Sequence, residues 1–574
     1  MGKGFTQAQF DASGFSVVVV DDGIDTGTAT PNHFGLYKHG EFVQGDRLDF
    51  NRGEGSATNA DGRDGHGNLN AHIVGGYVPS GTVGGTNFDA FPHSDANSFK
   101  YGLGVAPWVH LGGAKIFDPG FTFPDYEDME SRNYASGARI STNSWGASVG
   151  GAYNTDSQRY DALVRDAQPT GSAMPAAGNQ EMVIIFAAGN SGSGANTTGS
   201  PGTGKNLITV GASENVRAFG GSDGSGIGDS GADNANDIIF FSSRGPTDDL
   251  RFKPEIVAPG THVTGGVWQE NPTFTATGDA APLFNGSGVS GGVGSIYFPS
   301  SGQQYYTASS GTSHSTPAVA GGAALIRQRF INAGLTPPSP ALTKAALMSS
   351  ARYLNGVGAN DTLWSNNQGM GEMNLDMFFD YFVTPTIKVD QSATNTFTMT
   401  GETRVFNGTV IDPTRPVRIT TAWTDAPGPT SGNAFINNLD LEVTFGGNTY
   451  RGNVFTGPNS VSGGTADIRN NAESVFLPAG MTGPITITIR ATNIAGDGVP
   501  NFGGALDQDF ALIAYNVSEG LSVLNTTPAV GSIVSTAPMS FIVNVTEPVD
   551  PGSVQASDLL VNGIPANTVM YTAG

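Results

Sequence analysis

Short apolar runs that alternate with helical stretches constrain the fold of residues 1–384 more than any other feature of this chain. Val17–Val20 is apolar at consecutive positions, which is typical of a strand buried on both faces of a sheet. Met182–Ala187 and Leu207–Val210 repeat this pattern, and Thr316–Ala333 carries an apolar stripe with helical spacing. Buried strands that alternate with helices predict an α/β domain with a mostly parallel sheet.

The pattern changes after residue 384, where helical periodicity disappears. Short strand-like runs separated by Gly, Asn and Pro turns predict an all-β barrel or sandwich over residues 385–518. These runs are Val417–Ala422, Leu439–Phe445 and Ile485–Ala491. Residues 519–574 form a third region, with alternating apolar positions in Phe541–Val545. Because a complete β-sandwich needs roughly 100 residues, we expect only part of such a module there.

The composition excludes several classes of function. Lys and Arg number 27 against 50 Asp and Glu, so the net charge of −23 argues against nucleic-acid partners and anionic membrane surfaces. No apolar run approaches the roughly 20 residues of a membrane span. The absence of Cys excludes disulfides, thiolate metal sites and a Cys nucleophile. Residues 1–15 do not resemble a signal peptide, so we expect any export signal or pro-segment to lie outside this chain.

Two titratable side chains stand at the ends of predicted elements. Asp21 directly follows Val17–Val20, at the carboxyl edge where open α/β sheets place their sites, although for this segment alone an ordinary Asp-Gly turn is the simpler alternative. His66 stands between two glycines at a predicted helix start, so its ring can project into a cleft. A surface His beside a turn is the simpler alternative, and His72 is a rival within the same segment.

Two further polar residues fit the same kind of site. Asn190 ends the buried strand that begins near Met182, where an amide can donate to a developing oxyanion. The tetrapeptide Ala-Ala-Gly-Asn also ends at Asn179, but that copy follows a polar segment, so we favour Asn190. Ser313 stands at the start of the predicted helix, near its positive end. A helix N-cap is the alternative role for Ser313.

Together these segments resemble the subtilases, the subtilisin-like serine peptidases, whose catalytic Asp, His and Ser follow in this chain order with an oxyanion Asn between His and Ser. The resemblance spans about residues 17 to 350 and includes further segments between the four. It implies a catalytic triad of Asp21, His66 and Ser313 with Asn190 as oxyanion donor. It also implies substrate-binding walls formed by Ser144, Trp145, Gly146, Ala187, Ala188 and Gly189.

The later regions extend the resemblance. Residues 385–518 resemble the jelly-roll-like C-terminal β-barrel of secreted alkaline subtilases, which is similar to the P domain of proprotein convertases. Residues 519–574 resemble part of an immunoglobulin-like module. The resemblance implies a secreted, monomeric serine endopeptidase of broad specificity that acts on proteins or peptides. It also implies a structural Ca²⁺ ion, for which Asp425 and Asp440 are the candidate ligands and ordinary turn carboxylates the alternative.

Three positions depart from the family pattern. Asp22 stands where Ser or Thr usually follows the catalytic Asp. Three residues appear inserted after His66-Gly67, which makes the helix start uncertain and keeps His72 as a rival base. His314 replaces the Met that usually follows the nucleophile. Each departure falls beside a predicted catalytic residue.

Two other classes of function stay open at this point. A non-catalytic surface adhesin with a subtilase scaffold would bind through its C-terminal β modules, but the intact set of Asp21, His66, Asn190 and Ser313 argues against it. A metallohydrolase using His66 and His72 would be expected to carry a His-Glu-x-x-His helix, which is missing here. Labelling of Ser313 by a serine-directed phosphonylating reagent separates these alternatives.

Overall fold

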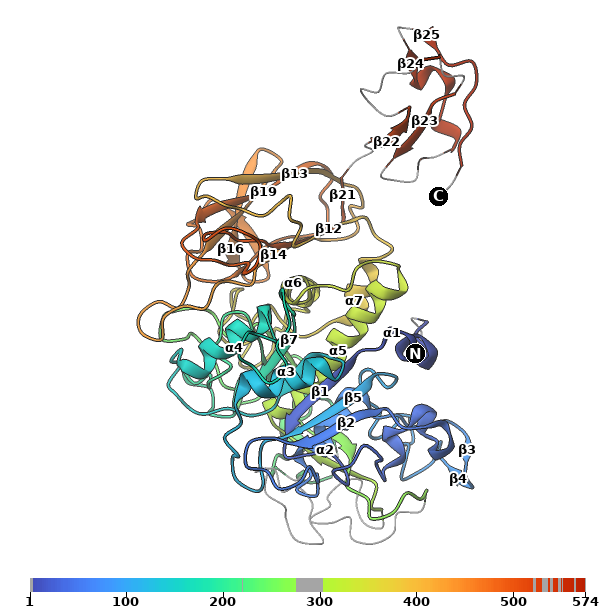
Figure 1. The fold of residues 1–574 in the computed structure, drawn as a ribbon, viewed down its shortest axis with the longest axis vertical. Helices are drawn as coiled ribbons and strands as arrows, with labels where there is room; N and C mark the ends of the chain where they lie inside the picture. The colour runs from blue at the N-terminus through green and yellow to red at the C-terminus, as the bar shows by residue number, and fades with distance from the viewer. Residues whose placement is uncertain are drawn as a thin grey trace.

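The computed structural model divides into a sheet-and-helix region, a β-rich region beside it and a small terminal group of strands (Figure 1). It describes residues 4–218, 220–223, 225–274, 303–519, 523–528, 535–536, 540–545, 549, 551–561 and 564–572. None of the described helices is long and apolar enough to cross a membrane.

A seven-stranded sheet forms the centre of the first region, and every neighbouring pair in it is parallel. The sheet order is β2 (Leu48–Gly53), β5 (His110–Lys115), β1 (Ser16–Asp21), β6 (Ala138–Asn143), β7 (Val183–Ala187), β8 (Ile208–Ser213) and β9 (Ile256–Pro259). This confirms the predicted α/β fold with a parallel sheet. Short antiparallel pairs lie outside it: β3 (Thr82–Val83) with β4 (Thr86–Asn87), and β10 (Val263–Gly266) with β11 (Tyr306–Ser309).

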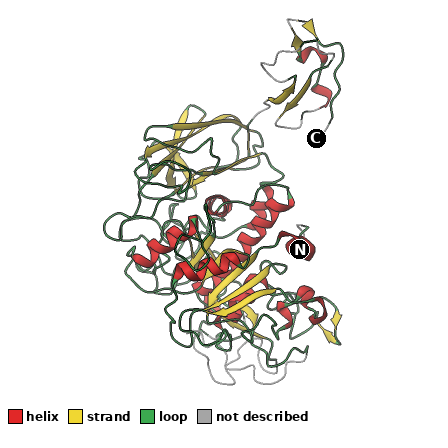
Figure 2. Cartoon of the chain, in the orientation of Figure 1, coloured by secondary structure: helices red, strands yellow, loops and turns green. Residues whose placement is uncertain are grey.

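Helices pack on both faces of this sheet (Figure 2). They are α1 (Gln7–Ser13), α2 (His66–Gly75), α3 (Tyr126–Ala135), α4 (Thr155–Arg165), α5 (Thr312–Asn332), α6 (Pro340–Ser350) and α7 (Leu375–Asp380). Side chains alternate between the two faces of β1: Val17 and Val19 join the core under α2 and α5, while Val18 and Val20 join the core under α3 and α4. The fully apolar run is therefore explained by burial on both sides.

Two antiparallel sheets form the β-rich region and enclose a second apolar core. One sheet contains β12 (Thr386–Asp390), β20 (Ala511–Tyr515), β14 (Val417–Ala422) and β18 (Ala472–Leu477). The other contains β17 (Asn459–Ser462), β16 (Asn448–Thr456), β15 (Asn438–Phe445), β19 (Gly483–Asn493), β13 (Thr403–Val410) and β21 (Val517–Ser518). The all-β prediction for this region is confirmed, whereas its jelly-roll character stays a prediction.

The β-rich region shares part of its core with the first region. Ala422, Phe476 and Tyr515 belong to the same apolar cluster as the residues of α5 and α6, and α6 packs against β14 and β20. The strands β22 (Val523–Thr527), β23 (Ile542–Val545), β24 (Leu560–Val561) and β25 (Ile564–Pro565) lie apart from both regions (Figure 1). Part of residues 519–574 lies outside the described residues, so the immunoglobulin-like assignment stays a prediction, as do the domain boundaries.

Candidate active site

A buried carboxylate and a partly exposed imidazole meet at the carboxyl edge of the parallel sheet. Asp21 is the last residue of β1, and His66 is the first residue of α2. His66 Nδ1 lies 2.7 Å from Asp21 Oδ1, with the His66 side chain 13% exposed and that of Asp21 3% exposed. Burial alone would lower the pKa of His66, but the charge and hydrogen bond of Asp21 outweigh it, so this pKa lies above its ordinary value.

The start of α2 is fixed by the second carboxylate, Asp22. Its two oxygens accept hydrogen bonds from the main-chain N–H groups of His66 (3.1 Å) and Gly67 (2.6 Å). These are among the N–H groups that a helix start leaves unpaired, so Asp22 caps α2 although it stands far from it in the sequence. Burial and the neighbouring charge of Asp21 raise the pKa of Asp22 to about 8. Asp22 is thus a buried cap and not a solvent-exposed turn residue.

The apparent insertion after His66-Gly67 is an ordinary part of the helix. α2 runs from His66 to Gly75 without a break, so the uncertainty about its start is removed. Asn70 then lies one turn after His66, and its Nδ2 donates to Asp21 Oδ2 over 2.9 Å. We had no prediction for Asn70, although the i,i+4 spacing from His66 places it on the same helix face.

The start of α5, which carries Ser313, lies beside this pair. The ring of His314, the next residue after Ser313, lies 5.5 Å from the ring of His66 between centroids. Pro317 has no N–H to donate to the carbonyl of Ser313 four residues before it. Ser144 Oγ donates to that carbonyl instead, over 2.7 Å, and Ser313 Oγ lies 3.3 Å from the Ser144 carbonyl. The predicted wall residue Ser144 therefore holds the turn that carries Ser313.

Asn190 lies beside the same turn, three residues after the end of β7. Its Oδ1 accepts hydrogen bonds from the N–H and the hydroxyl of Thr312, both over 2.9 Å, so its Nδ2 points the other way. A Cβ built on Gly311 would stand 3.4 Å from Asn190 Nδ2 and 3.6 Å from Ser313 N. Asn190 Nδ2 and Ser313 N thus lie near the same point beside Gly311, which is compatible with their predicted role as oxyanion donors.

The second copy of the tetrapeptide lies elsewhere. Asn179 precedes β7, and its Oδ1 accepts from Asn501 Nδ2 of the β-rich region over 3.0 Å. It therefore contacts an exposed loop and not the turn that carries Ser313.

The remaining predicted wall residues lie at or just after the ends of β6 and β7. Trp145 packs its ring against Phe186, with centroids 5.2 Å apart, and donates its Nε1–H to Asn143 Oδ1. Ala187 and Ala188 are buried, and Gly189 has a φ of 106°, a conformation that favours glycine. The N–H of Gly189 donates to Thr312 Oγ1 over 3.2 Å, which ties this segment to the start of α5. Gly146 is exposed.

The rival base His72 is buried on the inner side of α2. It is 1% exposed, and its ring contacts that of His33, with centroids 4.3 Å apart. Neither ring nitrogen has a hydrogen-bond partner among the described residues. Burial, with the nearby His33 and Arg47, lowers the pKa of His72 well below its ordinary value. A ring so enclosed cannot reach a substrate, which favours His66 as the base.

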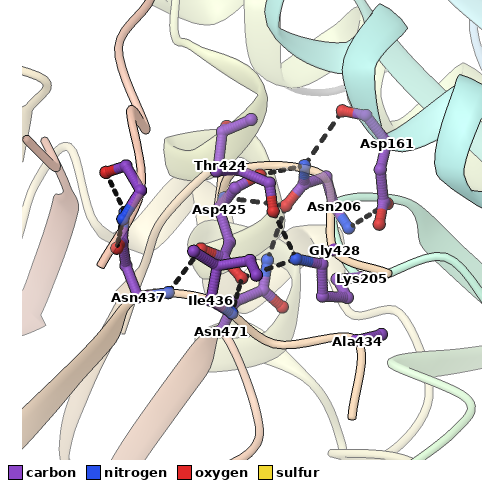
Figure 3. Close-up of polar contacts among 12 residues, drawn as sticks. Asp161, Lys205, Asn206, Thr424, Asp425, Gly428, Ala434, Ile436, Asn437 and Asn471 are labelled. Carbon is purple, nitrogen blue, oxygen red and sulfur yellow. Dashed lines mark hydrogen bonds and ion pairs between the residues drawn. The ribbon is translucent and has the colours of Figure 1, made fainter. Parts of the chain in front are cut away.

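The two candidate calcium ligands have separate hydrogen-bond partners. Asp425 Oδ2 accepts from Lys205 Nζ over 2.6 Å, and its oxygens also accept from the main-chain N–H groups of Ile436 and Asn437 (Figure 3). Asp440 instead accepts from Asn438 and Thr492. The ammonium group of Lys205 takes the place of a cation at Asp425, so this carboxylate does not fit a calcium site.

Within the part of the chain that the structure describes, no group of three or more His, Asp or Glu side chains is arranged to hold a metal ion. A structural Ca²⁺ ion elsewhere in the chain stays a prediction. The Lys205–Asp425 pair instead joins the sheet-and-helix region to the β-rich region, as does a second buried pair between Arg165 and Asp509, with an N–O distance of 2.6 Å. We did not predict these contacts between distant residues.

Residues 12–371 match the sequence model of the subtilase family, which covers more than half of the chain. The serine protease AprX of Bacillus subtilis is 35% identical over 191 residues, which cover 33% of this chain and 34% of that relative. Pyrolysin of Pyrococcus furiosus is 32% identical over 203 residues, covering 34% of this chain and 12% of that relative. The matched segments thus span about a third or less of the length of these curated relatives.

Solved structures of proteases also align with this chain. Sphericase is 22% identical with a TM-score of 0.37, and the alignment covers 63% of this chain and 92% of that one. The prenylagaramide maturation protease PagA is 19% identical with a TM-score of 0.39, and the alignment covers 65% of this chain and 95% of that one.

Proposed function

This chain belongs to the subtilase family, and on that premise we propose that it is a serine endopeptidase with Asp21, His66 and Ser313 as its catalytic triad. The observation that carries the proposal is the 2.7 Å contact between His66 Nδ1 and Asp21 Oδ1, beside the helix start that bears Ser313. This contact holds the imidazole with its Nδ1 protonated, which leaves Nε2 to accept a proton.

The mechanism follows from these roles. Ser313 Oγ attacks the scissile carbonyl carbon while His66 Nε2 takes the hydroxyl proton, and the carbonyl oxygen becomes an oxyanion. Asn190 Nδ2 and Ser313 N donate hydrogen bonds to that oxyanion. His66 then gives its proton to the leaving amine, and the acyl-enzyme is hydrolysed by water through the same steps. Because His66 must be neutral to act as base, kcat/KM should rise with pH through a pKa above the ordinary value for histidine.

We propose that an extended substrate lies between Ser144–Gly146 and Ala187–Gly189. Main-chain groups of such segments can pair with a substrate as with an added strand, which recognises backbone and not sequence. Specificity should therefore be broad, with a preference for large apolar side chains before the scissile bond. Secretion and a monomeric state stay predictions from the family resemblance.

The test is labelling with a serine-directed phosphonylating reagent, followed by peptide mapping and a casein hydrolysis assay. We expect stoichiometric labelling of Ser313 and loss of hydrolysis in proportion to the label. Hydrolysis that persists after complete labelling of Ser313, or labelling of another serine with loss of activity, would contradict the proposed triad.

A further inference from the structure

A chain of buried hydrogen bonds leads from the residue after the nucleophile to the carboxylate of the triad. His314 Nδ1 lies 2.9 Å from Asn70 Oδ1, and Asn70 Nδ2 donates to Asp21 Oδ2 over 2.9 Å. Asn70 and His314 are 0% and 1% exposed. The three residues come from β1, α2 and α5, the three elements that carry the catalytic side chains.

The chemistry of each group fixes the direction of this chain. An ionised carboxylate only accepts hydrogen bonds, so Asn70 must turn its NH₂ group toward Asp21. The amide oxygen of Asn70 then faces His314, and because this oxygen also only accepts, His314 must carry its proton on Nδ1. Burial and the nearby charge of His66 hold the pKa of His314 well below its ordinary value, so its ring stays neutral while His66 titrates.

The chain fixes both oxygens of the Asp21 carboxylate. Oδ1 accepts from His66 Nδ1 and from the main-chain N–H of Asp22, which lies 2.9 Å away. Oδ2 accepts from Asn70, so the carboxylate cannot rotate without breaking a buried hydrogen bond. Since His314 is bonded to Ser313 along α5, the same chain connects the helix of the base to the helix of the nucleophile.

Resting on the proposed function, we propose that Asn70 and His314 are positioning residues of this peptidase. Asn70 fixes the plane of the Asp21 carboxylate, and His314 fixes the orientation of the Asn70 amide. The pair also ties α2 to α5 beside the active site, and thereby holds His66 and Ser313 in register. Neither residue contacts the substrate in this scheme.

The pH dependence of activity reports this role. The charged and titratable groups that face His66 are Asp21 and Asp22 from the end of β1 and His314 from α5, while Asp64 acts on Asp22. Hydrogen bonds to Asp21 disperse its negative charge. If the Asn70 donor is removed, Asp21 will attract the imidazolium form of His66 more strongly, and the acid limb of kcat/KM will move to higher pH.

The experiment compares Asn70→Leu and His314→Leu with the matched control Asn68→Leu. Asn68 is also a fully buried asparagine of α2, but its side chain bonds to the main chain of Gly266 and Asp25. We expect Asn70→Leu and His314→Leu to lower kcat about ten- to a hundredfold with little change in KM, and to move the acid limb upward by about half a pH unit. Asn68→Leu should lower the melting temperature and leave the acid limb in place.

Rescue distinguishes orientation from packing. An asparagine at position 314 can place its Nδ2 near the position of the imidazole Nδ1, so His314→Asn should restore most of kcat and the wild-type acid limb. If the Leu variants at positions 70 and 314 change kcat no more than Asn68→Leu and keep the wild-type limb, the two residues are structural only and the inference is wrong. If a Leu variant does not fold, Asn70→Ser and His314→Gln displace the same donors. The pH of the acid limb of kcat/KM in these two variants then decides between a positioning role and a structural role.

Failure of the proposed function is visible separately in the wild-type protein. In that case the phosphonylating reagent would not label Ser313, or casein hydrolysis would continue after labelling. A labelled, active wild type whose position 70 and 314 variants behave as Asn68→Leu would overturn only the positioning role.

Discussion

Two buried aspartates, Asp21 and Asp425, accept the same number of hydrogen bonds but accept them from different partners. Each accepts three hydrogen bonds: Asp21 from His66, Asp22 and Asn70, and Asp425 from Lys205, Ile436 and Asn437. The decisive difference is access to solvent, because the His66 side chain is 13% exposed whereas that of Lys205 is 1% exposed.

On the proposed function, this difference separates a catalytic carboxylate from a structural one. Both carboxylates are stabilised by donors that replace water, as a buried charge requires. At Asp21 the partner is a partly exposed imidazole, which in the proposed mechanism gains and loses a proton. At Asp425 the partner is the ammonium group of Lys205, enclosed between two regions of the chain (Figure 3). In the proposed mechanism the first arrangement moves protons, whereas the second holds two regions together.

The largest expected effect comes from variants of the proposed triad around Asp21. We expect Ser313→Ala and His66→Ala each to lower kcat by about 10⁴-fold or more, because triad members act as a unit. The double variant should be scarcely less active than either single variant. Steady-state hydrolysis of casein and of a chromogenic peptide measures this. Substantial activity in His66→Ala, with loss in His72→Ala, would show that the base was wrongly assigned.

The second-largest expected effect comes from removing the ion pair at Asp425. Lys205→Met leaves a buried carboxylate without its cation, which should lower the free energy of unfolding by about 3–5 kcal/mol. Adding Asp425→Asn should recover part of this loss, since the unpaired charge is then removed. Urea unfolding measures both changes in the free energy of unfolding. At temperatures below the melting range, kcat should stay unchanged in each variant.

A chelator serves as the control for this second prediction. If Asp425 acts only through Lys205, the melting temperature of Asp425→Asn should respond to a chelator as the wild type does. A wild-type response that disappears in Asp425→Asn would instead place a calcium ion at this carboxylate, because an ion bound only by the folded state stabilises it.

The sequence predicted the region around Asp21 far better than the region around Asp425. The buried strand before Asp21 is apolar at every position, and the side chains that follow such strands meet at one edge of the sheet. The start of α5 was less clear: its apolar stripe begins at Thr316 and Ser313 was expected at or just before the helix start, whereas the helix begins at Thr312 with a polar first turn. Apolar periodicity cannot reveal a first turn whose side chains are polar.

The interface contacts had no local signal. Lys205 and Asp425 stand 220 residues apart in the sequence, and neither belongs to a motif that predicts contact with the other. The residue type of Asp425 suggested a metal ligand, whereas its function depends on a distant lysine. Asn70 is intermediate, since helical spacing from His66 could have identified it once the apparent insertion was recognised as continuous helix.

The third prediction concerns Asn190, the proposed oxyanion donor. Asn190→Ala removes one oxyanion donor, and we expect kcat to fall by about 10²–10³-fold with KM little changed. Asn179→Ala is the matched control, because Asn179 ends the same tetrapeptide but contacts Asn501. Steady-state kinetics on one peptide substrate measures both. Equal losses in the two variants, or a larger loss at position 179, would mean that the wrong copy was chosen.

The smallest expected effect on activity concerns His72. Unlike Asp21 and Asp425, this buried side chain has no hydrogen-bond partner among the described residues. We expect His72→Leu, which replaces the ring with an apolar group of similar size, to keep kcat close to the wild-type value. Its stability should depend less on pH. The pKa of His72 is lowered in the folded protein, so the stabilising effect of a neutral ring is present above about pH 6.5 and is lost as the pH falls.

Urea unfolding at pH 7.5 and pH 5.0 tests this last prediction. Burial lowers the pKa of His33 to about 3 and that of His93 to about 4, so both variant and wild type should still lose stability in acid. The loss between the two pH values should be smaller in His72→Leu, because the unfolded chain then binds one proton fewer. An equal loss would show that His72 is charged or hydrogen-bonded in the folded protein, and that its burial on the inner side of α2 does not control its protonation.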